Sequence, residues 1–131
     1  MIKVVCGILI RGNTVLIGKR KSNNNSYPSK WEFPGGKIDE GEDEWTACKR
    51  EWQEELNIDI NPFHQLRTIT KSDIEFTPFI LQLLGGKAKM LEHDELRFVE
   101  KKEFFKMDLT KLSKEAGRMF FDSYSIFLKP D

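Results

Sequence analysis

Acidic residues gather in one short stretch of the chain, KREWQEELNI, which spans residues 49–58. Glu51 lies three and four positions before Glu54 and Glu55, so a helix would place the three carboxylates on one face. Like charges at this spacing destabilise a helix by about 0.2–0.5 kcal/mol per pair. A hard divalent cation would reverse this repulsion, because carboxylate oxygens are the ligands that Mg²⁺ and Mn²⁺ prefer.

A solvated helix face is the alternative interpretation of these acids. It accounts for Asp43 and Glu44, because acids in the first turn of a helix complement its dipole, but it does not account for acids at the helix end. A zinc site is not indicated, since His64 and His93 are isolated and no cysteine–histidine cluster occurs in the sequence. We interpret both histidines as ordinary surface or core residues.

The loop before the acidic stretch contains Pro34, Gly35 and Gly36. Glycine lets a backbone approach a ligand closely, and a glycine-containing loop that opens onto a helix N-terminus can hold a phosphate or a metal ion. Turns use the same tripeptide often, so the loop supports a ligand site only in combination with the acids. We expect these three residues to end any regular element.

The helix that must carry the acids is predicted over residues 44–56. Asp43 is the expected N-cap, and Asn57 falls where a helix ends in a left-handed residue. The apolar positions recur with a helical period and lie within about 80° of arc, which predicts a core face. These positions are Trp45, Cys48, Trp52 and Leu56.

Strands are predicted on both sides of this helix, and a second amphipathic helix follows them. Before the helix, Gly12 and Asn13 join two apolar runs as a hairpin. Pro78 is expected to place its own strand at a sheet edge or a bulge. The predicted strands are residues 3–10, 14–20, 64–70, 74–84, 87–92 and 96–100. The last helix is expected to use Thr110 or Ser113 as its cap and to bury Leu112, Ala116, Met119, Phe120, Ser123 and Phe127. This order predicts an α/β (α+β) fold with a mixed sheet.

Length and composition restrict the class of protein further. A chain of 131 residues fits a single domain over residues 1–131. Its 21 basic and 21 acidic residues leave no net field to attract a nucleic acid polymer or an anionic membrane, and no apolar run reaches the roughly 18–20 residues of a membrane span. Cys6 and Cys48 lie in apolar patterns, so we expect free thiols in a reducing compartment, the cytoplasm.

The acidic stretch and its loop together match a longer pattern. From Gly36 the chain reads Gly, five residues, Glu42, seven residues, then REWQEELNI. This resembles the signature of the Nudix hydrolases at every fixed position except Asn57, where the family has Gly. The preceding WEFPGGKID is similar to the MutT-type branch, which hydrolyses nucleoside triphosphates to monophosphate and pyrophosphate. The resemblance implies the Nudix fold, a mixed β-sheet sandwiched between helices.

The resemblance also implies roles for individual residues. Mg²⁺, or Mn²⁺ in its place, would be held by the carboxylates of Glu51, Glu54 and Glu55 and by the Gly36 carbonyl. Arg50 joins Glu51 and Glu54 in the catalytic set, and Glu42 supports it. A fixed guanidinium that pairs with several acids offsets their repulsion and locks their rotamers. The base that accepts a proton from the attacking water is expected to be a signature glutamate or Glu95, which has a charged strand edge as its alternative role.

The resemblance implies a small-molecule nucleotide as substrate, bound by a monomer or a homodimer. Arg20, Lys37 and Phe79 are the candidate substrate-binding residues, although Phe79, like Phe76, has the core as its alternative place. The C-terminal residue that reads the base in MutT-type proteins has no clear counterpart here; the loose options are Asp108, Ser113 and Glu115. Oxidised guanine triphosphate (8-oxo-dGTP) is the nearest analogy. Hydrolysis of CTP, methylated dCTP or ADP-ribose, or nucleotide binding without catalysis, are the alternatives.

Overall fold

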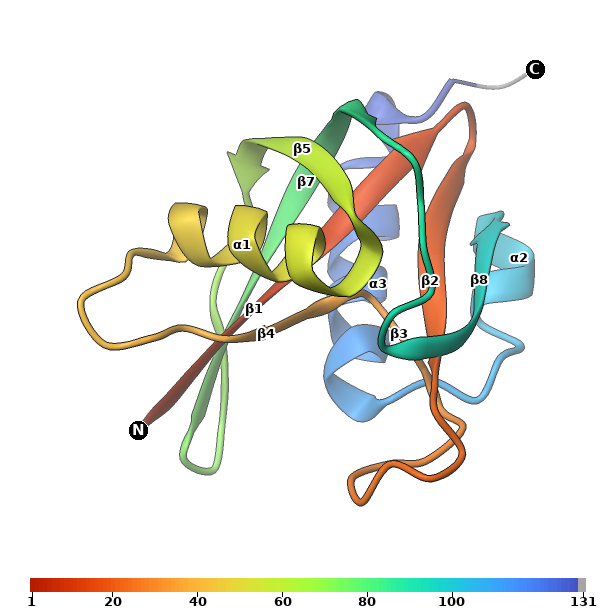
Figure 1. The fold of residues 1–131 in the computed structure, drawn as a ribbon. Coiled ribbons are helices and arrows are strands. Elements are labelled where there is room, and N and C mark those ends of the chain that lie inside the picture. The colour runs from red at the N-terminus through yellow and green to blue at the C-terminus, as the bar shows by residue number, and fades with distance from the viewer. Residues whose placement is uncertain (130–131) are drawn as a thin grey trace.

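The computed structural model describes residues 1–129 and shows a mixed sheet between two helices (Figure 1). The strands are β1 (Ile2–Arg11), β2 (Thr14–Arg20), β3 (Trp31–Glu32), β4 (Gly35–Lys37), β5 (Ile58–Gln65), β6 (Ile69–Lys71), β7 (Ile74–Gly86) and β8 (His93–Val99). The helices are α1 (Glu44–Leu56), α2 (Lys101–Phe104) and α3 (Lys111–Ser123), followed by a 3₁₀ turn at Ser125–Phe127.

The sheet has the strand order β3-β2-β1-β7-β5, with β4 paired to β1, β6 to β7 and β8 to β2. Only β1 and β7 run parallel among the strand pairs of residues 1–129, and the other pairs are antiparallel. Helix α1 lies on one face of the sheet and α3 on the other (Figure 1). The α+β class and the sheet between helices are therefore confirmed.

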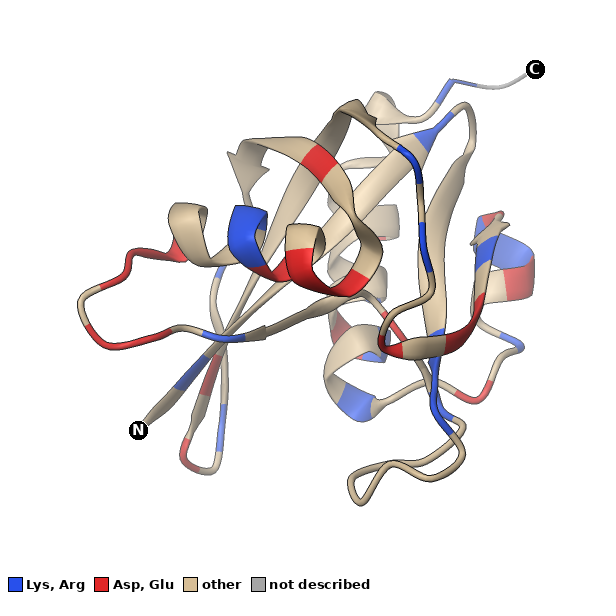
Figure 2. Cartoon of the chain, in the orientation of Figure 1, with Lys and Arg blue, Asp and Glu red and all other residues tan. Residues whose placement is uncertain are grey.

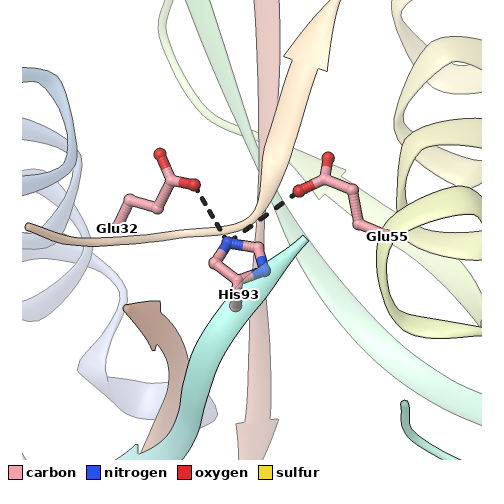
Figure 3. A group of neighbouring side chains, drawn as sticks. All are labelled: Glu32, Glu55 and His93. Atoms are coloured by element: carbon pink, nitrogen blue, oxygen red, sulfur yellow. Dashed lines mark hydrogen bonds and ion pairs between the residues drawn. The ribbon is translucent and has the colours of Figure 1, made fainter. Parts of the chain in front are cut away.

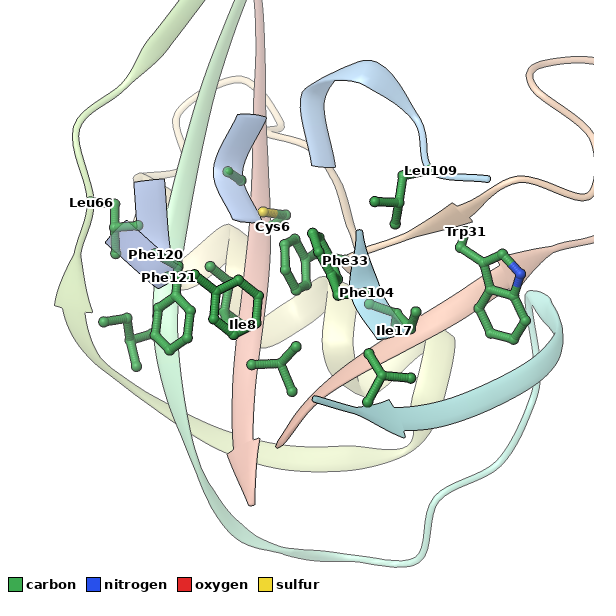
Figure 4. Packing of buried hydrophobic residues seen from close by; sticks show 14 of the residues in the cluster. Cys6, Ile8, Ile17, Trp31, Phe33, Leu66, Phe104, Leu109, Phe120 and Phe121 are labelled. Carbon is green, nitrogen blue, oxygen red and sulfur yellow. The ribbon is translucent and has the colours of Figure 1, made fainter. Parts of the chain in front are cut away.

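Each face of the sheet has its own hydrophobic core, because side chains alternate along every strand. On β1, Val5 and Leu9 pack with α1, whereas Cys6 and Ile8 pack with α3. The α3 side is rich in phenylalanine, and Figure 4 shows its rings packed between the sheet and α3. Cys6 and Cys48 are both buried free thiols, as expected.

Helix α1 has the predicted bounds and caps. The Asp43 side chain accepts a hydrogen bond from the Thr46 backbone N–H, and Asn57 ends the helix in the left-handed region at φ 56°. Cys48, Trp52 and Leu56 are fully buried, but Trp45 is 43% exposed, so its place in the core face was wrong. Residue 45 lies in the first turn, beyond the edge of the sheet core, and its ring reaches only the edge of another aromatic ring.

Pro78 was expected at an edge or a bulge, yet it lies inside β7. This strand pairs with β1 on one side and with β5 and β6 on the other. Both main-chain groups of a strand residue point to the same neighbour, and the Pro78 carbonyl accepts a bond from the Leu66 N–H. Leu66 falls in the gap between β5 and β6, so the missing N–H of the proline coincides with an interruption of pairing.

Four other local expectations were wrong. The strand predicted over residues 64–70 is interrupted at residues 66–68, which lie between β5 and β6. Gly35 and Gly36 do not end regular structure but form β4 with Lys37, paired to β1. Residues 87–92 form an irregular connection instead of a strand. Helix α3, capped by Thr110, ends at Ser123, so Phe127 lies in the 3₁₀ turn and is 36% exposed. Within residues 1–129, no helix combines the length and apolar character needed to cross a membrane.

Candidate active site

A cavity of about 250 Å³ opens beside the C-terminal half of α1. Its walls come from α1, the first residue of β4, the ends of β2 and β3, the loop after β2, and the residue before β8. Figure 2 shows acidic residues along α1 and at the start of β8, where this cavity lies. The lining residues are Arg20, Asn24, Glu32, Gly35, Glu51, Glu54, Glu55 and Glu92.

Arg50 holds several of the acids in place. Its Nε and Nη2 donate to the two carboxylate oxygens of Glu42 at 2.7 and 2.9 Å. Its Nη1 donates to Glu51 and Glu54 at 3.0 and 3.1 Å. These bonds from Arg50 hold the pKa of Glu42 at about 2, well below its usual value. The arrangement fixes Glu51 and Glu54 on the cavity side of the helix, which is the positioning role expected of Arg50.

The absence of a side chain at Gly36 leaves space for the Glu51 carboxylate. A Cβ on residue 36 would lie 2.5 Å from the carboxylate of Glu51, so any side chain there would displace the acid. This close approach of the β4 backbone to α1 is a physical reason for a glycine at the first position of the signature.

Gly35 lines the cavity, whereas Gly36 does not. The bonds from Gly7 to Pro34 and from Ile38 to Lys3 show which β4 residues pair with β1. Alternation along the antiparallel ladder turns residue 36 toward β1 and residue 35 away from it. We therefore infer that the Gly35 carbonyl, rather than the expected Gly36 carbonyl, is left free of β1 to face a cation.

Glu55 is the most enclosed of the signature acids, with 8% of its surface exposed. Burial, the adjacent carboxylate of Glu51 and the charge of Glu32 raise the pKa of Glu55 to about 10. The largest cause is the removal of this carboxyl group from water, and the crowding of like charges adds to it. A bound divalent cation would lower that pKa again, because it supplies the missing counter-charge.

The donor set fits Mg²⁺ or Mn²⁺. Carboxylates of Glu51, Glu54 and Glu55 and the carbonyl of Gly35 are all oxygen ligands, and they line one open cavity where waters can complete the coordination. Within residues 1–129, one group of three ligand-type side chains has its ligand atoms within 4.8 Å of one another: Glu32, Glu55 and His93. Glu32 and Glu55 line the cavity, and His93 lies behind them.

Arg20 lies in the cavity wall, as a substrate-binding residue would. Its Nη1 donates to Glu32 at 2.8 Å, and its Nε donates to the carbonyl of Ser26 at 2.9 Å. The guanidinium therefore links the end of β2 with β3 and with the loop of residues 21–30. This leaves Arg20 in a fixed position beside the signature acids.

Other predicted site residues lie elsewhere. Glu95 pairs with Arg97 at 2.6 Å and is outside the cavity wall, because the strand register of β8 places it opposite Lys19. Phe79 is 1% exposed and packs under α1, so its ring has no free face for a base. The Lys37 side chain is exposed and is not part of the cavity wall, although its carbonyl accepts a bond from the nearby arginine of α1.

Sequence reasoning missed four residues at this site. Glu32, Glu92 and Asn24 line the cavity, and His93 is buried behind it. The alternation of β3 offered a signal for Glu32, since its neighbour Trp31 faces the core. No local pattern points to the others, because their places depend on how β2, β3 and β8 meet.

The fold and this acidic cavity define a hydrolase domain of a known family. Residues 1–122 match the family model of the NUDIX domain, so the chain belongs to the Nudix family. Within it the chain is MutT-like: it is 32% identical over 111 residues to a Mycobacterium tuberculosis protein provisionally named 8-oxo-dGTP diphosphatase 2, covering 80% of this chain and 77% of that protein.

A second relative is the CTP pyrophosphohydrolase of Escherichia coli, 37% identical over 59 residues. That match covers 45% of this chain and 43% of the relative. Among solved structures, a Nudix hydrolase from Nitrosomonas europaea superposes with a TM-score of 0.83 at 19% identity, covering 98% of this chain and 74% of that one. The structural match supports the fold.

Proposed function

We propose that this Nudix hydrolase cleaves nucleoside triphosphates, with Mg²⁺, to nucleoside monophosphate and pyrophosphate. The observation that carries the proposal is the convergence of Glu51, Glu54 and Glu55 with Arg20 on one open cavity. The acids suit a hard cation, and the guanidinium suits the phosphate chain of a nucleotide.

In this proposal the signature acids and the Gly35 carbonyl bind the cation, and Arg50 keeps Glu51 and Glu54 pointed at it. The bound cation would neutralise the phosphates, polarise a phosphoryl oxygen and lower the pKa of the attacking water. Little covalent chemistry then remains for the chain, whose own contribution is to position the groups. Arg20 pairs with the phosphate chain and holds it across the cavity.

The proton of the attacking water needs an acceptor in the cavity wall. Glu54 and Glu92 both line the cavity, and both are exposed to water. They lie on different elements, α1 and the connection before β8. We propose Glu92 in the role first expected of Glu95, with Glu54 acting mainly as a ligand of the cation.

The first candidate substrate is 8-oxo-dGTP, supported by the name of the Mycobacterium tuberculosis relative, whose match spans most of both chains. CTP is the second candidate, supported by the shorter match to the Escherichia coli enzyme. ADP-ribose is a third candidate that shares the pyrophosphate group. All three place a pyrophosphate bridge beside the same acids.

Pyrophosphate release should be measured with Mg²⁺ across canonical triphosphates, 8-oxo-dGTP, methylated dCTP and ADP-ribose. The proposal expects release from at least one triphosphate and preference for 8-oxo-dGTP. Glu44→Gln, on the same helix but outside the cavity and the Arg50 bonds, serves as a matched control with normal turnover. Hydrolysis of no member of the panel would overturn the proposal in favour of a binding module, and equal rates on all triphosphates would overturn the preference.

A further inference from the structure

The first residue of β8, His93, is a buried polar side chain that the proposed chemistry does not use. It is 3% exposed and lies under the cavity between β3 and α1 (Figure 3). Room for its ring comes from Gly18 on β2, where a Cβ would lie 2.6 Å from the ring carbon Cδ2. The lack of a side chain at Gly18 therefore allows this imidazole to pack beside the acids of the cavity.

The ring nitrogens of His93 have unequal surroundings. Nε2 lies 3.0 Å from an oxygen of Glu32 and 3.9 Å from an oxygen of Glu55 (Figure 3). Nδ1 is buried and has no hydrogen-bond partner in the described part of the chain. The Glu32 carboxylate, which lies within hydrogen-bond range, can only accept, so Nε2 carries the proton. An unprotonated Nδ1 costs less than a buried N–H without an acceptor.

These surroundings argue against His93 as a metal ligand. Coordination through Nε2 would move the proton to Nδ1, where it would have no acceptor. Histidines that bind metals almost always donate their other N–H to a carboxylate, a carbonyl or water. The bond from Nε2 goes to Glu32, since the 3.9 Å separation from Glu55 is beyond hydrogen-bond range.

Glu32 is consequently held at both oxygens. Arg20 donates to Oε1 at 2.8 Å, and His93 donates to Oε2 at 3.0 Å. Arg20 in turn donates through Nε to the carbonyl of Ser26. A continuous chain of bonds thus runs from the start of β8, through β3 and the end of β2, into the loop of residues 21–30.

We propose that His93 is a positioning residue that acts through Glu32 to hold Arg20 in the orientation that binds the substrate. This inference rests on the proposed function for its kinetic consequences, but its structural part does not depend on hydrolysis. Without the His93 bond, the Glu32 carboxylate can rotate, and Arg20 follows it away from the phosphate chain. The effect should fall on substrate binding and not on the cation.

The kinetic test compares His93→Leu with His93→Gln, which keeps an N–H donor near the position of Nε2. His93→Leu should raise KM for the best triphosphate about tenfold, as expected for a lost buried bond to a charged group. His93→Gln should restore KM to within about threefold. The kcat and the Mg²⁺ concentration at half-activation should change little. The control His64→Gln should behave as the original chain, because the His64 ring lies beside Tyr124, away from the cavity.

A double-mutant cycle separates this relay from a general loss of packing. In an Arg20→Ala background, His93→Leu should add no further increase in KM, because the group it positions is gone. Additive effects of the two substitutions would overturn the proposal. If His93→Leu does not fold, Glu32→Gln provides the same test, since it weakens both bonds while keeping the size of the side chain.

Two readouts remain valid even if no substrate is hydrolysed. In ¹⁵N NMR spectra His93 should show the neutral tautomer with its proton on Nε2, and His93→Leu should speed exchange of the Arg20 Nε proton. Pulsed EPR of the Mn²⁺-loaded chain should show no nitrogen coupling from a coordinated imidazole. A proton on Nδ1, or such a nitrogen coupling, would overturn the positioning role and make His93 a metal ligand.

Discussion

The two faces of the sheet are covered by helices of the same length, yet the proposed active site lies on only one face. On the α3 face, phenylalanine rings close the space, with Phe33 stacked on Phe104 at 5.3 Å and Phe120 edge-on to Phe121 at 5.2 Å. On the α1 face, a buried stripe around Trp52 packs on the sheet, while the flank of the helix beside this stripe carries the acids.

The difference shows how a helix can be anchored and still carry unfavourable charge. The buried stripe of α1 fixes the helix, so the repulsion among its acids cannot move them apart. On the side of α3 that faces the sheet, the contacts are apolar and stabilise the fold. Substitutions on the outer face of α1 should therefore alter activity more than folding, and substitutions under α3 should do the opposite.

The largest effect is expected on the free energy of unfolding, from a substitution in the core under α3. Phe120 is fully buried, so Phe120→Ala should lower the free energy of unfolding by about 3–5 kcal/mol, the usual cost of an aromatic-to-alanine cavity. Chemical denaturation followed by circular dichroism would measure it. The folded fraction should keep its KM and kcat. A loss of turnover in correctly folded protein would contradict the assignment of the α3 face to stability and of the α1 face to activity.

On the outer face of α1, Glu54→Gln should lower kcat at least about 100-fold, which corresponds to about 2.7 kcal/mol. The Glu54 side chain is 58% exposed, so the free energy of unfolding should change little. Steady-state kinetics beside thermal melting would separate the two quantities, and Glu44→Gln serves as the control. Undiminished turnover would remove Glu54 from the metal site.

The crowded acids also predict a pH dependence of stability. Because the pKa of Glu55 is about 10 in the folded chain and near 4.5 when unfolded, its stabilising contribution is complete below about pH 4.5 and is lost as the pH rises toward 10. The metal-free protein should therefore melt at lower temperature at pH 9 than at pH 6. Glu55→Gln should flatten this dependence.

Mg²⁺ should counteract that loss, because it binds the ionised carboxylates. At a concentration ten times its Kd, Mg²⁺ would stabilise the folded chain by about 1.4 kcal/mol. A fixed Mg²⁺ concentration should stabilise more strongly at pH 9 than at pH 6, because the Kd is lower where the carboxylates are ionised. Melting curves with Mg²⁺ and with a chelator would measure the difference. An equal response at both pH values would contradict the proton-linked site.

The smallest effect is expected at Asn57, the one departure from the signature. Asn57→Gly would remove the backbone strain of a left-handed residue with a side chain, but it would lose the bond from the Asn57 side chain to the carbonyl of Lys87. The net change in the free energy of unfolding should therefore stay below about 1 kcal/mol. Asn57→Ala keeps the backbone cost and loses the bond, and it should destabilise more. Activity should persist in the glycine variant.

Features that depend on neighbouring residues were predicted well from the sequence. The N-cap at Asp43, the left-handed end at Asn57 and the buried stripe of α1 follow from periodicity and from side-chain chemistry within a few positions. The signature acids meet on one face for the same reason. The left-handed end of α1 confirms that the mismatch at Asn57 falls on a backbone requirement that asparagine can meet.

Features that depend on strands meeting across the fold could not be predicted. Glu32, Glu92 and His93 reach the cavity because β2 pairs with both β3 and β8. The same pairing directs Glu95 to the outside. Pro78 was misplaced because the gap between β5 and β6, which makes a central proline acceptable, has no local signature.

The end of α1 is bound to the connection that follows β7. Besides the Asn57–Lys87 bond, the N–H groups of Lys89 and Leu91 donate to the carbonyls of Leu56 and Glu55. These bonds tie the last turn of the helix to the segment that delivers Glu92 and His93. Helix end and connection should therefore open together as one cooperative unit, so that slow hydrogen exchange in this segment would report directly on the integrity of the cavity.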